Sequence, residues 1–170
     1  LLKNKLVIIF FVDQNLKNLP LSEILDIEKL NNVEKSIEVA NGLPNECYTN
    51  ANYLAHEREK VFFNKWTVVG VGSSIPNAGD AKPYNLLGIP LILIRDKNMK
   101  IRVFHNVCSH RGFKLLDKAC TFKNVIRCPY HSWSYDFKGN LVATPHIGGL
   151  NNHQSEKFDK TKSNLKEVKV

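Results

Sequence analysis

Two short stretches, CSHRG at residues 108–112 and CPYHSW at residues 128–133, constrain this chain most strongly. Each carries one thiol and one imidazole at close spacing, Cys108 with His110 and Cys128 with His131. Thiolate and neutral imidazole are the protein groups that bind zinc and iron–sulfur clusters. The pattern therefore predicts a four-ligand metal site built from two loops.

The distribution of these ligands favours one kind of metal group. Two Cys and two His can hold a tetrahedral zinc ion, the commonest structural use of such a set. Zinc sites usually place the Cys pair and the His pair in separate segments, whereas each loop here carries one of each. This arrangement suits a two-iron cluster in which two thiolates bind one iron and two imidazoles bind the other. We expect a Rieske-type 2Fe-2S cluster, with structural zinc as the alternative.

The sequence around the ligands resembles a known family. The run NVCSHRG followed by CPYHSWSYDFKGNL is similar to the Rieske domain of the alpha (large) subunits of ring-hydroxylating, Rieske non-heme iron oxygenases. The resemblance implies that Cys108 and Cys128 bind the inner iron and that His110 and His131 bind the outer one. It covers roughly residues 42–170. The segment EREKVFFNKW at residues 57–66 is similar to the one that precedes the Rieske domain in these alpha subunits, which argues against a small free-standing ferredoxin.

The same resemblance implies a function in electron transfer. In that family the alpha subunit takes electrons from a reductase or ferredoxin and passes them to a mononuclear iron that activates oxygen, within a homotrimer. Two His and a carboxylate hold that iron in a separate domain, whereas His146 and His153 have only Asp159 nearby here. The sequence also starts without Met, which suggests a fragment. We therefore expect the Rieske portion of an oxygenase, without its catalytic domain or any catalytic residue. A stand-alone Rieske-type ferredoxin is the alternative.

The remaining cysteines are expected to be reduced. Rieske proteins of respiratory and photosynthetic cytochrome complexes join their loops by a disulfide, whereas Phe113 and Tyr130 stand at those positions here. The resemblance is thus to the disulfide-free branch. Cys47 and Cys120 are expected to be free thiols, because a thiolate-ligated iron cluster indicates a reducing compartment. We accordingly expect a cytoplasmic protein.

Groups around the cluster follow from the same resemblance. Backbone N–H groups of loop residues, such as Arg111 and Gly112, are expected to point at the bridging sulfides. Trp133 and Tyr135 are expected to shield one side of the cluster, and an ordinary aromatic core is an alternative interpretation of both. These groups would tune the reduction potential, which spans about −150 to +300 mV in Rieske centres.

The net charge of +8 could indicate an anionic partner. The lysines are dispersed, however, and no basic run is interleaved with aromatic residues, so we expect no nucleic-acid binding. A solvated surface is the favoured interpretation, and an encounter surface for an acidic electron donor is the alternative. The apolar run Leu6–Val12 is shorter than the roughly twenty residues of a membrane span, and we expect a strand or packing arm there.

The pattern of apolar residues predicts a mainly β (α+β) fold. We expect a small antiparallel β-sandwich of Rieske type with two cluster-binding hairpin loops, preceded by N-terminal helices. Helical spacing predicts two helices between residues 21 and 41 and another from about residue 50 to 65. Short β runs follow at residues 67–71, 91–95, 101–104, 125–128 and 141–143. Residues 1–50 would form a helical extension and residues 51–170 the Rieske domain.

Two turns are predicted between strands. The segment RDKNMKIR at residues 95–102 indicates a hairpin in which Asn98 takes the positive φ, which Asn tolerates well. A second turn ends at Gly139, which is free to adopt the left-handed conformation. The stretch GVGSSIP from Gly70 superficially resembles a dinucleotide loop. It lacks the third Gly, and Pro76 stands where a helix would begin, which excludes that function.

Overall fold

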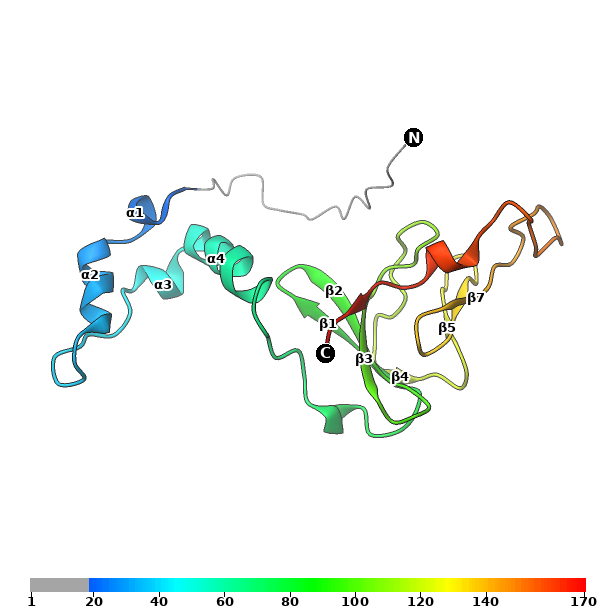
Figure 1. Cartoon of the computed structure of the whole chain (residues 1–170), viewed down its shortest axis with the longest axis horizontal. Helices are drawn as coiled ribbons and strands as arrows, with labels where there is room; N and C mark the ends of the chain where they lie inside the picture. Colours follow the sequence, from blue (N-terminus) through cyan, green and yellow to red (C-terminus); the bar gives the residue numbers. More distant parts are fainter. Residues whose placement is uncertain (1–18) are drawn as a thin grey trace. The chain divides into compact units, whose positions relative to one another are not determined.

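The computed structural model describes residues 19–170, which belong to two compact units (Figure 1). One unit extends to Val68 and the other runs from Val69 to Val170. The chain is mostly antiparallel sheet preceded by short helices, which confirms the predicted fold class. The apolar run Leu6–Val12 lies outside the described residues, and the domain boundary after residue 50 stays a prediction. Within residues 19–170, no helix has the length and apolar character needed to span a membrane.

Short helices make up the first unit. They are α1 (Leu21–Ile24), α2 (Ile27–Asn31), η1 (Asn32–Glu34), α3 (Glu46–Thr49), α4 (Ala51–Glu57) and η2 (Arg58–Phe62). Asp26 caps α2 and Asn50 caps α4, because each side chain accepts hydrogen bonds from backbone N–H groups of the first turn. The helix predicted over residues 50–65 is therefore present, and it widens into a π-helical turn at η2.

Two antiparallel sheets make up the second unit. The larger has the order β4-β1-β2-β3-β8 and contains β1 (Asp80–Leu86), β2 (Ile89–Arg95), β3 (Ile101–His105), β4 (Cys120–Thr121) and β8 (Glu167–Val168). The smaller has the order β5-β6-β7 and contains β5 (Ile126–Arg127), β6 (Ser134–Tyr135) and β7 (Leu141–Ala143). Two 3-10 turns, η3 (Gly72–Ser74) and η4 (Lys160–Ser163), connect these elements.

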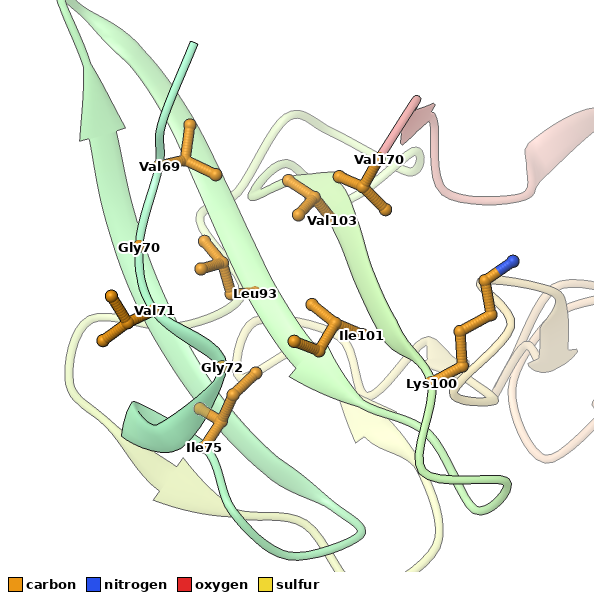
Figure 2. Close-up of a pocket in the computed structure, with 10 residues that line it drawn as sticks. All are labelled: Val69, Gly70, Val71, Gly72, Ile75, Leu93, Lys100, Ile101, Val103 and Val170. Carbon is orange, nitrogen blue, oxygen red and sulfur yellow. The ribbon is translucent and has the colours of Figure 1, made fainter. Parts of the chain in front are cut away.

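The strand predicted at residues 67–71 is wrong. Those residues form no strand, and the larger sheet ends in the two-residue strands β4 and β8 instead. The chain instead crosses a face of that sheet (Figure 2). Val69 packs there against a small apolar cluster of Ile75, Leu91, Leu93 and Val103. A groove of about 330 Å³ remains there, lined by apolar side chains and by Lys100.

The opposite face of the larger sheet carries the main core. Alternation along β2 sends Ile92 and Ile94 to this side and Leu91 and Leu93 to the other. The main core also includes Cys108 and Cys128, together with aromatic residues of the smaller sheet and its loops. Both predicted metal-binding cysteines therefore lie in the layer between the two sheets.

The hairpin between β2 and β3 is present, but its turn differs from the prediction. Met99 has the positive φ of 62°, not Asn98. The buried Asp96 carboxylate explains the difference, because its Oδ1 accepts hydrogen bonds from the backbone N–H groups of Asn98 and Lys100, both at 2.9 Å. These bonds fix Asn98 inside the turn and move the left-handed position one residue further. Gly139 has φ 86°, as predicted.

Candidate metal centre

The first cysteine loop is a tight turn closed by backbone hydrogen bonds. The Cys108 N–H donates to the Phe113 carbonyl at 2.8 Å, and the Gly112 N–H donates back to the Cys108 carbonyl at 2.9 Å. Gly112 has φ 69°, which is why a glycine suits this position. Its N–H donates within the turn, and the expectation that loop N–H groups point at bridging sulfides stays a prediction.

The second loop repeats this turn residue for residue. The Cys128 N–H donates to the Trp133 carbonyl at 2.8 Å, and the Ser132 N–H donates to the Cys128 carbonyl at 3.0 Å. Ser132 has φ 59° and corresponds to Gly112. The two loops share one backbone frame and differ in where the imidazole stands, on the second residue after Cys108 and the third after Cys128. His131 thereby reaches the neighbourhood of His110.

The two cysteine side chains are almost fully buried, with exposed fractions of 1% for Cys108 and 2% for Cys128. Burial raises the pKa of the Cys108 thiol, and hydrogen bonds from Tyr135 and the His110 backbone only partly oppose this. Proximity to Cys128 raises that pKa further. The metal-free Cys108 is therefore a thiol at neutral pH, and metal binding has to displace its proton.

The two imidazoles lie beside each other. The ring centroids of His110 and His131 are 4.8 Å apart in an edge arrangement, and His110 also stacks on Trp133 with centroids 4.5 Å apart. Burial, followed by the nearby His131 and Arg111, lowers the pKa of His110. The neutral ring that results is the form that binds metals.

His131 has the donor atom that best fits a bound metal. Its Nδ1 atom is buried, and it has no hydrogen-bond partner among the described residues. Buried polar nitrogens are rarely left unpaired, and such an atom calls for a water, an ion or another bound group. A metal bound at Nδ1 satisfies it, so the donor set fits a metal group held by the two loops.

The arrangement suits a two-centre group better than a single ion. The two thiols are buried in the core, whereas the two imidazole rings lie beside each other with their centroids 4.8 Å apart. Tetrahedral zinc needs four donors at about 2.0–2.3 Å from one ion. A binuclear cluster spreads its ligands over two metals, with the buried thiols on one and the imidazoles on the other.

The chain also matches known proteins at this site. The model of the Rieske [2Fe-2S] domain family matches residues 65–154, a segment that includes both loops. The chain belongs to this family. Its cofactor is the Rieske-type 2Fe-2S cluster, as the sequence predicted.

Relatives of this Rieske domain are oxygenase subunits. The carnitine monooxygenase oxygenase subunit of Escherichia coli (strain K12) is 37% identical over 115 residues, which are 68% of this chain and 31% of the relative. Biphenyl 2,3-dioxygenase subunit alpha of Rhodococcus jostii (strain RHA1) is 37% identical over 98 residues, 58% of this chain and 21% of the relative. The predicted resemblance to oxygenase alpha subunits is thus confirmed.

A solved structure gives the same result. A quaternary ammonium Rieske monooxygenase in complex with gamma-butyrobetaine matches with a TM-score of 0.64 and 35% identity, over 75% of this chain and 35% of that chain. The Rieske chain described here spans between 21% and 35% of the length of these three relatives.

The loops of this Rieske domain contact each other through aromatic rings. Phe113 and Tyr130 have ring centroids 5.3 Å apart and are both exposed. All four cysteines of the chain are free, including Cys47 and Cys120. The contact between the loops is therefore noncovalent, at the positions where the resemblance indicated that a disulfide is missing.

Asn106 positions the first loop and was missed from the sequence. Its side chain is 1% exposed; its Oδ1 accepts the N–H groups of Leu115 and Leu116 at 3.0 and 2.9 Å, and its Nδ2 donates to the Leu116 carbonyl at 2.6 Å. These bonds join Asn106, which precedes the first loop, to Leu115 and Leu116, which follow it. The sequence offers one signal, a polar residue that follows a predicted strand and precedes the first cysteine loop.

His146 and His153 do not join the site. Their rings lie 5.0 Å apart in an exposed turn, where the His153 Nδ1 accepts the His146 N–H at 3.1 Å. The His146 Nδ1 in turn accepts the Asn151 N–H at 3.0 Å. Asp159 instead accepts hydrogen bonds from Thr161 at the start of η4. These three residues thus make local contacts, and both histidines are exposed; their exclusion from any iron site stays a prediction.

Proposed function

We propose that this chain is the electron-transfer portion of an oxygenase alpha subunit, and that Cys108, His110, Cys128 and His131 bind its 2Fe-2S cluster. The unpaired, buried Nδ1 of His131 carries this proposal. The repeated turn of the two loops and the two buried thiols support it. When bound, the cluster accepts and releases one electron at a time.

The protein groups prepare the site for that role. The buried thiols would hold one half of the cluster away from water, whereas His131 lies beside the exposed ring of Tyr130. An electron therefore has its shortest path to solvent or a partner through the imidazole side. Phe113 and Tyr130 provide the apolar surface at that exit.

In the whole protein, we propose that a reductase or ferredoxin supplies the electron to this side. The net charge of +8 favours an acidic donor. A mononuclear iron in a further domain, within a cytoplasmic homotrimer, would receive the electron and activate oxygen. The names of the relatives include carnitine and biphenyl, so the proposed substrate is an organic molecule, and aromatic ring hydroxylation is one of two candidate reactions.

Cluster binding can be tested directly on this chain. After anaerobic reconstitution, iron and acid-labile sulfide should be present in equal amounts, with the electron paramagnetic resonance signal of a Rieske centre on reduction. The substitution His131→Ala should abolish this signal. The matched control His146→Ala removes an exposed imidazole that belongs to the other histidine pair, and it should leave the iron and sulfide content unchanged.

Two results would contradict the proposal. Zinc bound without labile sulfide would establish the structural-metal alternative, and loss of the cluster in both variants would remove the assignment of His131. The product of the native gene distinguishes the remaining alternative. An additional mononuclear iron supports an oxygenase subunit, whereas a product of about this length without that iron would support a ferredoxin.

A further inference from the structure

Three hydroxyl and carbonyl groups form a connected chain behind Cys108. The fully buried Tyr135 places its Oη 3.2 Å from the Cys108 Sγ and 2.8 Å from the Ser109 Oγ. The Ser109 backbone N–H donates to the same Oη at 3.1 Å. The Ser109 Oγ also lies 2.5 Å from the carbonyl oxygen of Ser163, at the end of η4.

Counting hydrogens settles the direction of most of these bonds. A carbonyl oxygen can only accept, so the Ser109 hydroxyl donates its single hydrogen to Ser163. The Ser109 Oγ can then only accept from Tyr135. The Tyr135 oxygen already accepts the Ser109 N–H, and its own hydrogen is the last to be placed.

That hydrogen has two acceptors in reach. A tyrosine phenol keeps its proton at neutral pH, because its ordinary pKa is about 10. A cluster-bound Cys108 is a thiolate and can only accept. The thiolate sulfur and the Ser109 Oγ therefore compete for one Tyr135 hydrogen.

We propose that Ser109 is a positioning residue that draws the Tyr135 hydrogen away from the Cys108 sulfur and thereby lowers the reduction potential of the bound cluster. The inference rests on the proposed function, in which Cys108 binds the cluster. Hydrogen bonds to cluster sulfurs are one of the features that set the potential of iron–sulfur centres. A donated hydrogen stabilises the reduced state more, because that state carries more negative charge.

The competition depends on the segment that contains Ser163. The Leu165 N–H donates to the Gly139 carbonyl at 2.8 Å, and the Asn164 side chain accepts the Leu141 N–H at 2.8 Å. These bonds fix the Ser163 carbonyl against the smaller sheet. A shift of this segment releases the Ser109 hydrogen, which can then turn to Tyr135, and the Tyr135 hydrogen becomes fully available to the sulfur.

Redox titration of the reconstituted chain tests the inference through the signs of three shifts. Tyr135→Phe removes the donor and keeps the ring, so the potential should become more negative. Ser109→Ala removes the competing acceptor, so the potential should become more positive. The double variant should match Tyr135→Phe alone, because Ser109 acts only through Tyr135. Ser134→Ala is the matched control, since its hydroxyl bonds the Ser132 carbonyl and not a sulfur.

A spectroscopic measurement supports the titration. Iron–sulfur stretching bands in resonance Raman spectra should shift between H₂O and D₂O. Loss of the Tyr135 donor should weaken this isotope shift, and Ser109→Ala should enlarge it. Ser109→Ala leaves the buried phenol in place, so it tests the inference even if Tyr135→Phe binds little of the cluster.

Specific outcomes would overturn the inference. A potential that is unchanged in Ser109→Ala, or that moves in the same direction as in Tyr135→Phe, excludes competition for the hydrogen. Normal loading with such potentials would refute this inference alone. Absence of labile sulfide from the unsubstituted chain would refute the proposed function as well.

Discussion

Gly139 offers a sharp test of how the turn between β6 and β7 packs on the main core. It has φ 86°, and a methyl group at its Cα would lie 2.6 Å from Cε1 of Phe104. Phe104 is fully buried in the main core and has no room to move. Gly139→Ala therefore combines an unfavourable backbone conformation with an overfilled core.

The expected loss can be estimated from these two effects. A non-glycine residue in the left-handed region costs about 1–2 kcal/mol, partly offset by the lower entropy of the unfolded alanine chain. Overpacking adds about 1–3 kcal/mol. We expect a total destabilisation of about 1–4.5 kcal/mol for Gly139→Ala. Gly88 has φ 96° with no neighbouring atom within 4 Å of its added methyl, so Gly88→Ala should lose only about 1 kcal/mol.

Urea unfolding, followed by far-ultraviolet circular dichroism, measures the free energy of unfolding of both variants. Both proteins are compared either with the cluster bound or without it. The difference between them isolates the contact with Phe104. Equal midpoints for Gly139→Ala and Gly88→Ala would refute the packing argument, because the backbone effect alone would then account for both. A larger loss in Gly88→Ala would also contradict it.

Two further perturbations test a buried charge and the loop contact. Burial acts to raise the pKa of Asp96, but hydrogen bonds from Arg102 and the backbone of Lys100 and Asn98 outweigh it and leave the pKa below the ordinary 3.8. Asp96→Asn should cost about 1.5–3 kcal/mol at neutral pH, measured by urea unfolding. That stabilisation is present above pH 3.8 and disappears as the pH falls through the lowered pKa of Asp96. The free energies of unfolding of the two proteins should therefore become similar in acid. A difference that stays constant with pH would contradict the role of the Asp96 carboxylate. Phe113→Ala removes the ring contact with Tyr130, worth about 0.5–1.5 kcal/mol, and should speed cluster release about two- to tenfold in a chelator assay. An unchanged rate would show that the rings do not hold the loops together.

The family and the central hairpin could be predicted from the sequence, and the four metal ligands stay a prediction. The pattern of Cys and His pointed to the family. Strand β2 followed from the continuous apolar run LILI, and β3 followed from the apolar residues of IRVF between turn residues. Strand β1 could not be predicted, because its sequence DAKPYNL is polar and contains Pro83. Pairing with β2 along its whole length, a tertiary effect, overrides that local preference.

The surroundings of the site were harder to predict than its ligands. Tyr135 was expected to shield the cluster, yet its bonds to Cys108 and Ser109 depend on a contact across 26 residues or more of sequence. Ser163 lies 54 residues from Ser109. Such contacts follow from the packing of η4 against the smaller sheet, and no local pattern encodes them.

The order of the strands has a consequence for synthesis on the ribosome. The pairing of β1, β2 and β3 is local, so this meander can form as soon as residue 105 has emerged. The layer that buries Cys108 and Cys128 needs Trp133, Tyr135 and finally Leu165, which are made later. Since nascent chains grow at about 5–20 residues per second, both thiols stay accessible for seconds on a partly folded scaffold. That interval gives the cell a defined window in which to deliver iron and sulfide.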